Sequence, residues 1–180
     1  MLDQGRYTWR HDSILNLIFG KWTSIINQNE KLFCDLPNKF TGISTVPSDL
    51  VITALRPDIV CVNETEKSVT LFELTVPFDT NIENAKARKT GKYENLVNDL
   101  CEVGYDTNLV TFEISSRGLI TKDNSERIKL LFNLNNNELK LFCKMLQKTA
   151  IVSSYIIFHS KFEQDWISPS YLVNLNSKLS

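Results

Sequence analysis

The feature that constrains this sequence most is a strand, a helix and a second strand that follow one another in the middle of the chain. Residues 69–76 and 108–114 are rich in β-branched and aromatic side chains, which is typical of strands. Pro77 ends the first run, and residues 81–102 carry apolar side chains at helical spacing before Gly104. Since such a connection within one sheet is right-handed and leaves both strands parallel, the order predicts a parallel pair.

The flanking segments extend this unit into a mixed α/β fold. Residues 59–62 predict a strand that a polar turn joins to residues 69–76, so residues 50–76 are expected to contain an antiparallel hairpin or meander. Helical spacing and capping patterns indicate helices that start at Asp12 or Ser13, at Asn81, at Asp123 with Glu126 three residues later, and at about Glu138. We therefore expect a small mixed β-sheet flanked by α-helices.

No internal repeat and no shift in composition divides the chain. We expect one domain over residues 1–180, with a core at about 6–115 that carries the sequence motifs and a helical C-terminal part at about 120–180. The 180 residues are 42% hydrophobic and 23% charged, which excludes disordered, collagen-like and low-complexity chains. A chain of this length buries a core without a disulfide or a structural metal.

The net charge and the cysteine spacing narrow the class of protein further. Twenty basic and 21 acidic side chains give a net charge of -1, which excludes a histone-like protein held to DNA by bulk charge but not a nuclease. No apolar run approaches the roughly 20 residues of a membrane span, and the first residues lack the apolar region of a signal peptide. We expect a soluble protein without membrane contact that is not secreted by that route. The widely spaced cysteines predict buried thiols rather than a zinc site: Cys34, Cys61, Cys101 and Cys143.

Two acidic residues stand out against apolar surroundings. Asp58 follows Pro57 at the start of one expected strand, and Glu73 lies in the middle of the next. By strand alternation Glu73 shares one face with Leu71 and Thr75. An unpaired carboxylate at such a site costs several kcal/mol, so a cation should lie beside it.

The following helix offers that cation. Lys89 falls near the centre of its apolar stripe, with Lys92 about 60° round the helix. From Glu73 the strand advances about 16 Å before the turn, and the returning helix covers about 12 Å by Lys89 and about 16 Å by Lys92. Both lysines can therefore come back level with Glu73. We expect Lys89 to be the more buried and Lys92 to lie closer to a bound nucleic acid.

Two carboxylates and a lysine in this arrangement suit metal-dependent hydrolysis of a phosphodiester. The carboxylates can hold Mg²⁺ or Mn²⁺ with open water positions, and the metal polarises the phosphate and acidifies a bound water. The lysine then orients that water or neutralises developing charge.

Four short segments follow one another along the chain: Arg10-His11-Asp12, Arg56-Pro57-Asp58, Glu73-Leu74-Thr75-Val76 and Lys89-Thr90-Gly91-Lys92-Tyr93. Together they resemble the restriction-like endonuclease domain of site-specific non-LTR retrotransposons, which belongs to the PD-(D/E)xK superfamily. The match covers about residues 6–95, roughly half of the chain, and departs from the superfamily pattern at Thr75, where the lysine of ExK would stand. In the retrotransposon type that lysine is displaced onto the following helix. No reverse transcriptase and no zinc knuckle accompany the match.

The resemblance implies a restriction-endonuclease-like core and a Mg²⁺-dependent endodeoxyribonuclease that nicks a target site for a retroelement. Asp58 and Glu73 would be the metal ligands, with Lys89 or Lys92 as the catalytic lysine. Duplex DNA would be the partner, together with the reverse transcriptase and RNA of a parent element, and the location would be intracellular and nuclear. Residues implied to bind DNA or support the site are Arg10, His11, Asp12, Arg56, Thr75, Lys86, Arg88 and Tyr93.

Each of these residues also has a structural interpretation. Asp58 can cap a turn, Glu73 can belong to a buried ion pair, and both lysines can extend past the core to water. Arg10 and His11 can anchor the first helix locally, the basic helix face can simply be solvated, and Tyr93 can be a core residue. Two other functions stay open: a DNA-binding or protein-interaction module with an impaired site, and a branched-DNA resolvase or repair nuclease.

Overall fold

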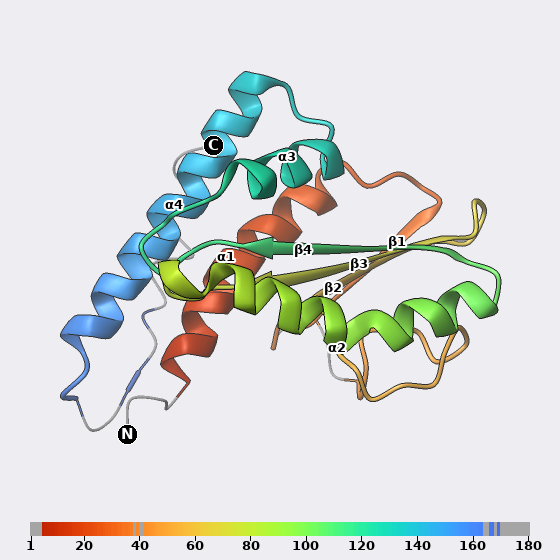
Figure 1. The fold of residues 1–180 in the computed structure, drawn as a ribbon, viewed down its shortest axis with the longest axis horizontal. Helices are drawn as coiled ribbons and strands as arrows, with labels where there is room; N and C mark the ends of the chain where they lie inside the picture. Colours follow the sequence, from red (N-terminus) through yellow and green to blue (C-terminus); the bar gives the residue numbers. More distant parts are fainter. Residues whose placement is uncertain (1–4, 38, 40–41, 164–165, 168, 170–180) are drawn as a thin grey trace.

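A four-stranded sheet runs through the part of the chain that the computed structural model describes, residues 5–37, 39, 42–163, 166–167 and 169 (Figure 1). Its order is β1-β2-β3-β4, with β1 and β2 antiparallel, β2 and β3 antiparallel, and β3 and β4 parallel. The strands are β1 (Glu30–Cys34), β2 (Ile59–Asn63), β3 (Ser68–Thr75) and β4 (Asp106–Glu113).

Helices cover both faces of this sheet (Figure 1). The connection from β3 to β4 contains a short 3-10 turn, η1, and the long helix α2, which packs on one face. The first helix, α1, lies on the other face with α3 and α4. The bounds are α1 (Arg6–Thr23), η1 (Asp79–Asn81), α2 (Ile82–Glu102), α3 (Lys122–Leu131) and α4 (Asn136–His159).

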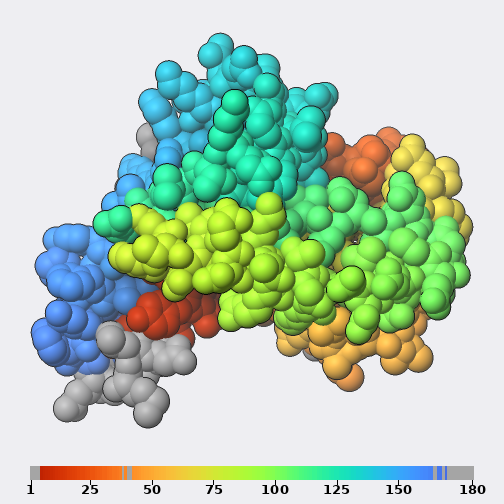
Figure 2. All heavy atoms as spheres, viewed as in Figure 1, coloured from red at the N-terminus to blue at the C-terminus, as the bar shows by residue number. Residues whose placement is uncertain are grey.

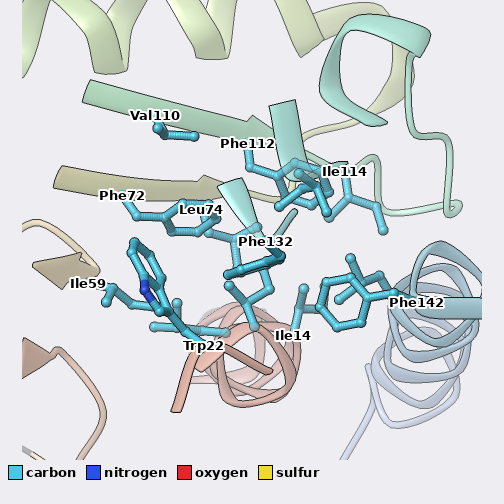
Figure 3. Packing of buried hydrophobic residues seen from close by; sticks show 14 of the residues in the cluster. Ile14, Trp22, Ile59, Phe72, Leu74, Val110, Phe112, Ile114, Phe132 and Phe142 are labelled. Atoms are coloured by element: carbon cyan, nitrogen blue, oxygen red, sulfur yellow. The ribbon is translucent and has the colours of Figure 1, made fainter. Parts of the chain in front are cut away.

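Strand alternation divides the interior into two apolar clusters. Phe72 and Leu74 of β3 point toward α1. There Trp22 packs against both Phe72 and Phe132, in the cluster that Figure 3 shows. The Trp22 ring lies edge-on to both aromatics, with its centroid 6.1 Å from that of Phe72 and 5.7 Å from that of Phe132. Leu71, two residues from Glu73, faces α2 in the second cluster. The α2 side is therefore the one to which Glu73 belongs.

The structure confirms the mixed α/β architecture that the sequence predicts. The hairpin expected from residues 59–62 and 69–76 is the β2–β3 pair, and the strand expected at 108–114 is β4, parallel to β3. The predicted helical C-terminal part is helical to His159; residues 164–165, 168 and 170–180 lie outside the described residues.

One strand was missing from the prediction. β1 pairs along its whole length with β2, with Leu32 opposite Cys61. Only Cys34 of this strand is buried, because β1 lies at the edge of the sheet. Its sequence has two charged residues followed by three apolar ones, so it lacks the alternation that predicts a strand.

Several helix starts also differ from the prediction. α1 begins at Arg6 rather than at Asp12 or Ser13, because buried arginines fix its first turns: Arg6 donates to the carbonyl oxygens of Ser160 and Glu163. α3 is capped by Thr121, whose hydroxyl accepts from the amide of Asn124, and not by Asp123. Asn81 occupies the N-cap position of α2 without a side-chain bond. α4 starts earlier than expected, with a capping box between Asn135 and Glu138.

Two expectations from composition need correction. α4 is long and apolar enough to cross a membrane by length and composition, with a mean hydropathy of 1.2 in its most apolar window, a third of which is buried in the protein. A core helix of a soluble protein meets the same criterion.

Not all cysteines are buried, contrary to the prediction from the sequence. Cys34 and Cys61 are buried, Cys143 is half-buried, and Cys101 is exposed because it lies on the outer side of α2.

Candidate active site

The first component of the site is a pair of adjacent carboxylates. Asp58 immediately precedes β2, and because Ile59 pairs with Phe72, Asp58 lies beside Glu73 across the two strands. The Asp58 amide donates to Oε2 of Glu73 at 3.2 Å, and the Leu74 amide donates to Oδ2 of Asp58 at 2.7 Å. Asp58 is 7% exposed and Glu73 only 1%. The structure therefore places the two acids beside each other across β2 and β3.

A lysine from α2 completes the pairing that burial of Glu73 demands. Nζ of Lys89 donates to Oε1 of Glu73, and the Lys89 side chain remains 20% exposed. Lys92 is exposed and has a different partner: its Nζ bonds the hydroxyl of Tyr93, which in turn donates to the carbonyl of Arg56 at 2.9 Å. Of the two lysines, Lys89 therefore reaches the carboxylates, and Lys92 borders them through Tyr93.

The first helix contributes a histidine to Asp58. Nε2 of His11 lies 3.2 Å from Oδ2 of Asp58, and Nδ1 lies 3.1 Å from Oδ1 of Asp12. Burial alone would lower the pKa of this imidazole, but the bonds to Asp12 and Asp58 outweigh it and raise the pKa to about 10. His11 is therefore an imidazolium at neutral pH that holds Asp58 in place.

The electrostatics of the site follow from burial. Burial and the neighbouring charge of Asp58 raise the pKa of Glu73, while Lys89 acts against this rise. Burial, with the charge of Glu73, also raises the pKa of Tyr93, which keeps its phenol protonated as a donor. The ion pair with Lys89 is thus what allows Glu73 to carry charge in an apolar wall.

The other predicted residues form a supporting ring. Arg56 is paired with Asp35 at the entrance to β2. Arg10 is buried and donates to the Val76 carbonyl at 3.1 Å and to the Ser154 hydroxyl at 3.0 Å, so it ties the residue after β3 to α4.

On α2, Lys86 is bound to Asp123 of α3 at 3.1 Å, whereas Arg88 is exposed. Thr75 lies two residues from Glu73 on the same face, and its buried hydroxyl has no hydrogen-bond partner among the described residues. The basic face of α2 therefore presents Arg88 and Lys92 to solvent, next to the pair formed by Lys89.

The sequence reasoning missed a second buried ion pair on the same face. Glu113 of β4 is 1% exposed and lies in register with Thr75, and Arg127 of α3 donates to its Oε2 at 3.3 Å. Arg127 also donates to the hydroxyl of Thr111, the register neighbour of Glu73, at 2.8 Å. The sequence did carry a signal for this pair. Glu113 is an acid at the end of an apolar strand, just as Glu73 is an acid within one.

Asp58 and Glu73 are the side chains of this site that could hold a hard divalent cation. No group of three or more His, Cys, Asp or Glu side chains among the described residues is placed to hold a metal. Asp58 and Glu73 would thus supply two carboxylates, and water and substrate phosphate the remaining ligands, as is usual for Mg²⁺. Both carboxylates already have protein partners, since His11 contacts Asp58 and Lys89 contacts Glu73.

Comparison with known proteins adds no relative to this picture. No protein-family model matches the chain, and a search of the curated proteins finds no match. The site is therefore interpreted from its own geometry.

Proposed function

We propose that this chain is a metal-dependent DNA endonuclease built on a restriction-endonuclease-like core. One observation carries the proposal: Asp58 and Glu73 meet across β2 and β3, and Lys89 of the following helix donates to Glu73. Two carboxylates with an ammonium group beside them are the components that metal-assisted phosphodiester hydrolysis requires.

The topology supports the same interpretation. β1, β2 and β3 form an antiparallel meander, and α2 connects β3 to the parallel strand β4. This is the mixed sheet with a crossover helix that the resemblance to the retrotransposon endonuclease domain implies. The displacement of the lysine from position 75 to α2 also agrees with that resemblance, because β3 contains no lysine and the cation that donates to Glu73 is Lys89 of α2.

Each residue has a definite task in this proposal. Asp58 and Glu73 would hold Mg²⁺ or Mn²⁺, which supplies Lewis-acid polarisation of the phosphate and an acidified water when bound. Lys89 neutralises charge that develops at the reacting phosphate. His11, braced by Asp12, orients Asp58. The proposed biological role is nicking of a duplex target site so that a 3′ hydroxyl is exposed for a parent element's reverse transcriptase and RNA.

Exposed cations of α2 would hold the DNA backbone next to the carboxylates. Arg88 and Lys92 are exposed and flank Lys89 along the helix. Each contact to phosphate releases a counterion, so binding should weaken with salt and each lost contact should reduce the slope by about one.

The direct test incubates supercoiled plasmid with the full chain and Mg²⁺ or Mn²⁺. Conversion to the nicked form is expected with the native chain and is expected to disappear in Asp58→Ala and in Glu73→Gln. Asp49→Ala, which removes an exposed acid away from the site, is the matched control and should cut normally. Nicking that survives Asp58→Ala would overturn the proposal. Parallel reactions with a four-way junction and a flap separate a target-site nuclease from a branched-DNA resolvase or repair nuclease, which would prefer those substrates to linear duplex.

A second candidate is a DNA-binding or protein-interaction module with an impaired site. It is favoured by the fact that both oxygens of Glu73 already accept hydrogen bonds, one from Lys89 and one from the Asp58 amide. Calorimetric titration with Mn²⁺ separates the two. Binding that is lost in Glu73→Gln supports the nuclease, and absence of binding in the native chain supports the module.

A further inference from the structure

The outer side of α4 carries an exposed stripe with lysines toward its N-terminal half and aromatic side chains toward its C-terminal half. The buried residues of this helix, such as Leu146 and Ala150, face the core, and the stripe lies on the opposite side at about 100° per residue. In Figure 1 the helix runs along one edge of the molecule, and Figure 2 shows its blue end projecting from the body. We call the following residues the α4 stripe: Leu141, Lys144, Lys148, Ile151, Tyr155, Phe158 and, just beyond the helix, Phe162.

The apolar members of the α4 stripe are unusually open to solvent. Their exposed fractions run from 51% for Ile151 to 85% for Phe162. Aromatic side chains this exposed, in one contiguous row, are typical of a surface that contacts another molecule.

The two halves of the α4 stripe complement each other when two copies of the helix lie antiparallel. On one side of Ile151 lie two lysines, Lys148 and Lys144, and on the other side lie two aromatics, Tyr155 and Phe158, at matching distances along the helix. An antiparallel pairing of two α4 helices, centred near Ile151, thus places each lysine pair over an aromatic pair of the other copy. A parallel pairing would instead place lysine against lysine.

These aromatics already attract ammonium groups within the chain. Nζ of Lys161 lies 4.3 Å from the ring centroid of Phe158 and 4.8 Å from that of Phe162. A cation above an aromatic face is favourable, and more so when water is excluded from the contact. From these observations we propose that the chain forms an antiparallel homodimer through the α4 stripe.

The size of the surface predicts a weak dimer. Complete burial of an aromatic side chain covers about 150–250 Å², so three aromatics and two aliphatic residues at these exposures supply on the order of 500–700 Å². The stems of the lysines add to this area. The sum lies slightly below the roughly 800 Å² per copy of a stable complex. The dimer should therefore form at high protein concentration and dissociate on dilution.

A membrane surface fits the α4 stripe less well than a second copy does. Interfacial helices keep apolar side chains along one whole face and lysines on the opposite face. Here Lys144 and Lys148 lie in the same row as the aromatics, so only half of the row could enter a lipid surface. The antiparallel copy uses both halves.

Sedimentation equilibrium of the full chain over a wide concentration range tests the proposal, with two charge variants. In Tyr155→Lys/Phe158→Lys, four lysines face four lysines across the dimer, and the protein should remain monomeric. In Lys144→Glu/Lys148→Glu, carboxylates face aromatics, and association should weaken at least tenfold. An equimolar mixture of the two variants should associate again, because lysines then oppose glutamates. All four positions are exposed, so the fold is retained.

The control is Leu130→Lys on α3, a residue that is 79% exposed but lies off the α4 stripe, and it should dimerise like the native chain. A native chain that stays monomeric at the highest concentration would overturn the proposal, as would a dimer that both variants leave unchanged. Sedimentation of the monomer with anionic phospholipid vesicles would assign the stripe to a membrane surface and overturn the proposal too.

Discussion

Lys89 reaches back from α2 to donate a hydrogen bond to Glu73, sixteen residues earlier on β3. The contact joins a carboxylate that is 1% exposed to an ammonium group at the rim of the site. It explains how an acid can occupy an apolar strand, and it places a cation beside the proposed metal ligand without a lysine on the strand itself.

Removal of this cation should destabilise the protein in a pH-dependent way. Lys89→Met leaves Glu73 buried and unpaired, which should cost about 2–4 kcal/mol of unfolding free energy at neutral pH. Burial raises the pKa of Glu73 above its ordinary value of 4.5, so the variant keeps its stability below that pH and loses it as the pH rises.

Urea unfolding at pH 4 and pH 8 measures the effect of Lys89→Met. The double variant Lys89→Met/Glu73→Gln should recover most of the loss at pH 8, because no charge is then buried. An equal loss at both pH values would contradict the assigned ion pair.

The imidazole of His11 should remain charged well above neutral pH in the chain without added metal. Its pKa is raised to about 10 by the bonds to Asp12 and Asp58, although burial opposes the rise. The stabilisation is present below the ordinary pKa of 6.5 and is lost as the pH rises through about 10. NMR titration of the ring protons reports this directly, with His11→Gln to assign the signals. A His11 signal that titrates near pH 6.5 would refute the bridge between the two aspartates.

The second buried pair should matter for stability. Arg127→Met leaves Glu113 without its cation and Thr111 without a donor, so the free energy of unfolding should fall by about 2–4 kcal/mol. Thermal unfolding measures the change. Arg88→Met removes an exposed arginine from α2 and should shift stability by at most about 0.5 kcal/mol. Equal effects of the two variants would argue against a buried role for Arg127.

The cysteines should react with iodoacetamide in an order that follows burial. Burial raises the pKa of the Cys34 and Cys61 thiols to about 12, so little thiolate forms in the folded protein at pH 8. Cys101 is exposed and should be alkylated first. Mass spectrometry after timed quenching identifies the modified residues. Modification of Cys61 before Cys101 would show that the β-sheet opens or that β1 does not cover this strand.

The central elements could be predicted because their signals are local. The apolar runs of β2, β3 and β4 and the helical stripe of α2 are each continuous in sequence, and chirality then determines the parallel pair. The same elements predicted that Lys89 or Lys92 would come level with Glu73, because the rise per residue of a strand and of a helix is known. The structure then shows that Lys89 donates to Glu73, whereas Lys92 bonds Tyr93.

What was missed depends on tertiary contacts. β1 is an edge strand whose pairing with β2 leaves only Cys34 buried, and it lacks the alternation that predicts a strand. The first turns of α1 rest on Arg6 and Arg10, whose partners lie more than sixty residues away. Glu113 has a sequence signal, because it is an acid at the end of an apolar strand. Its cation, Arg127, lies on α3, and no spacing rule connects a residue of β4 to one of α3.

Single-turnover cleavage of duplex DNA by Lys89→Ala and Lys92→Ala tests the central claim most directly, with DNA affinity measured in parallel. Lys89→Ala should lower the cleavage rate by about two orders of magnitude or more with little change in affinity, because its ammonium group lies on Glu73. Lys92→Ala, which removes an exposed cation, should instead weaken binding and reduce its salt dependence. Full cleavage by Lys89→Ala would contradict the proposed role of this lysine, and a native chain that cleaves no DNA with Mg²⁺ or Mn²⁺ would contradict the nuclease itself.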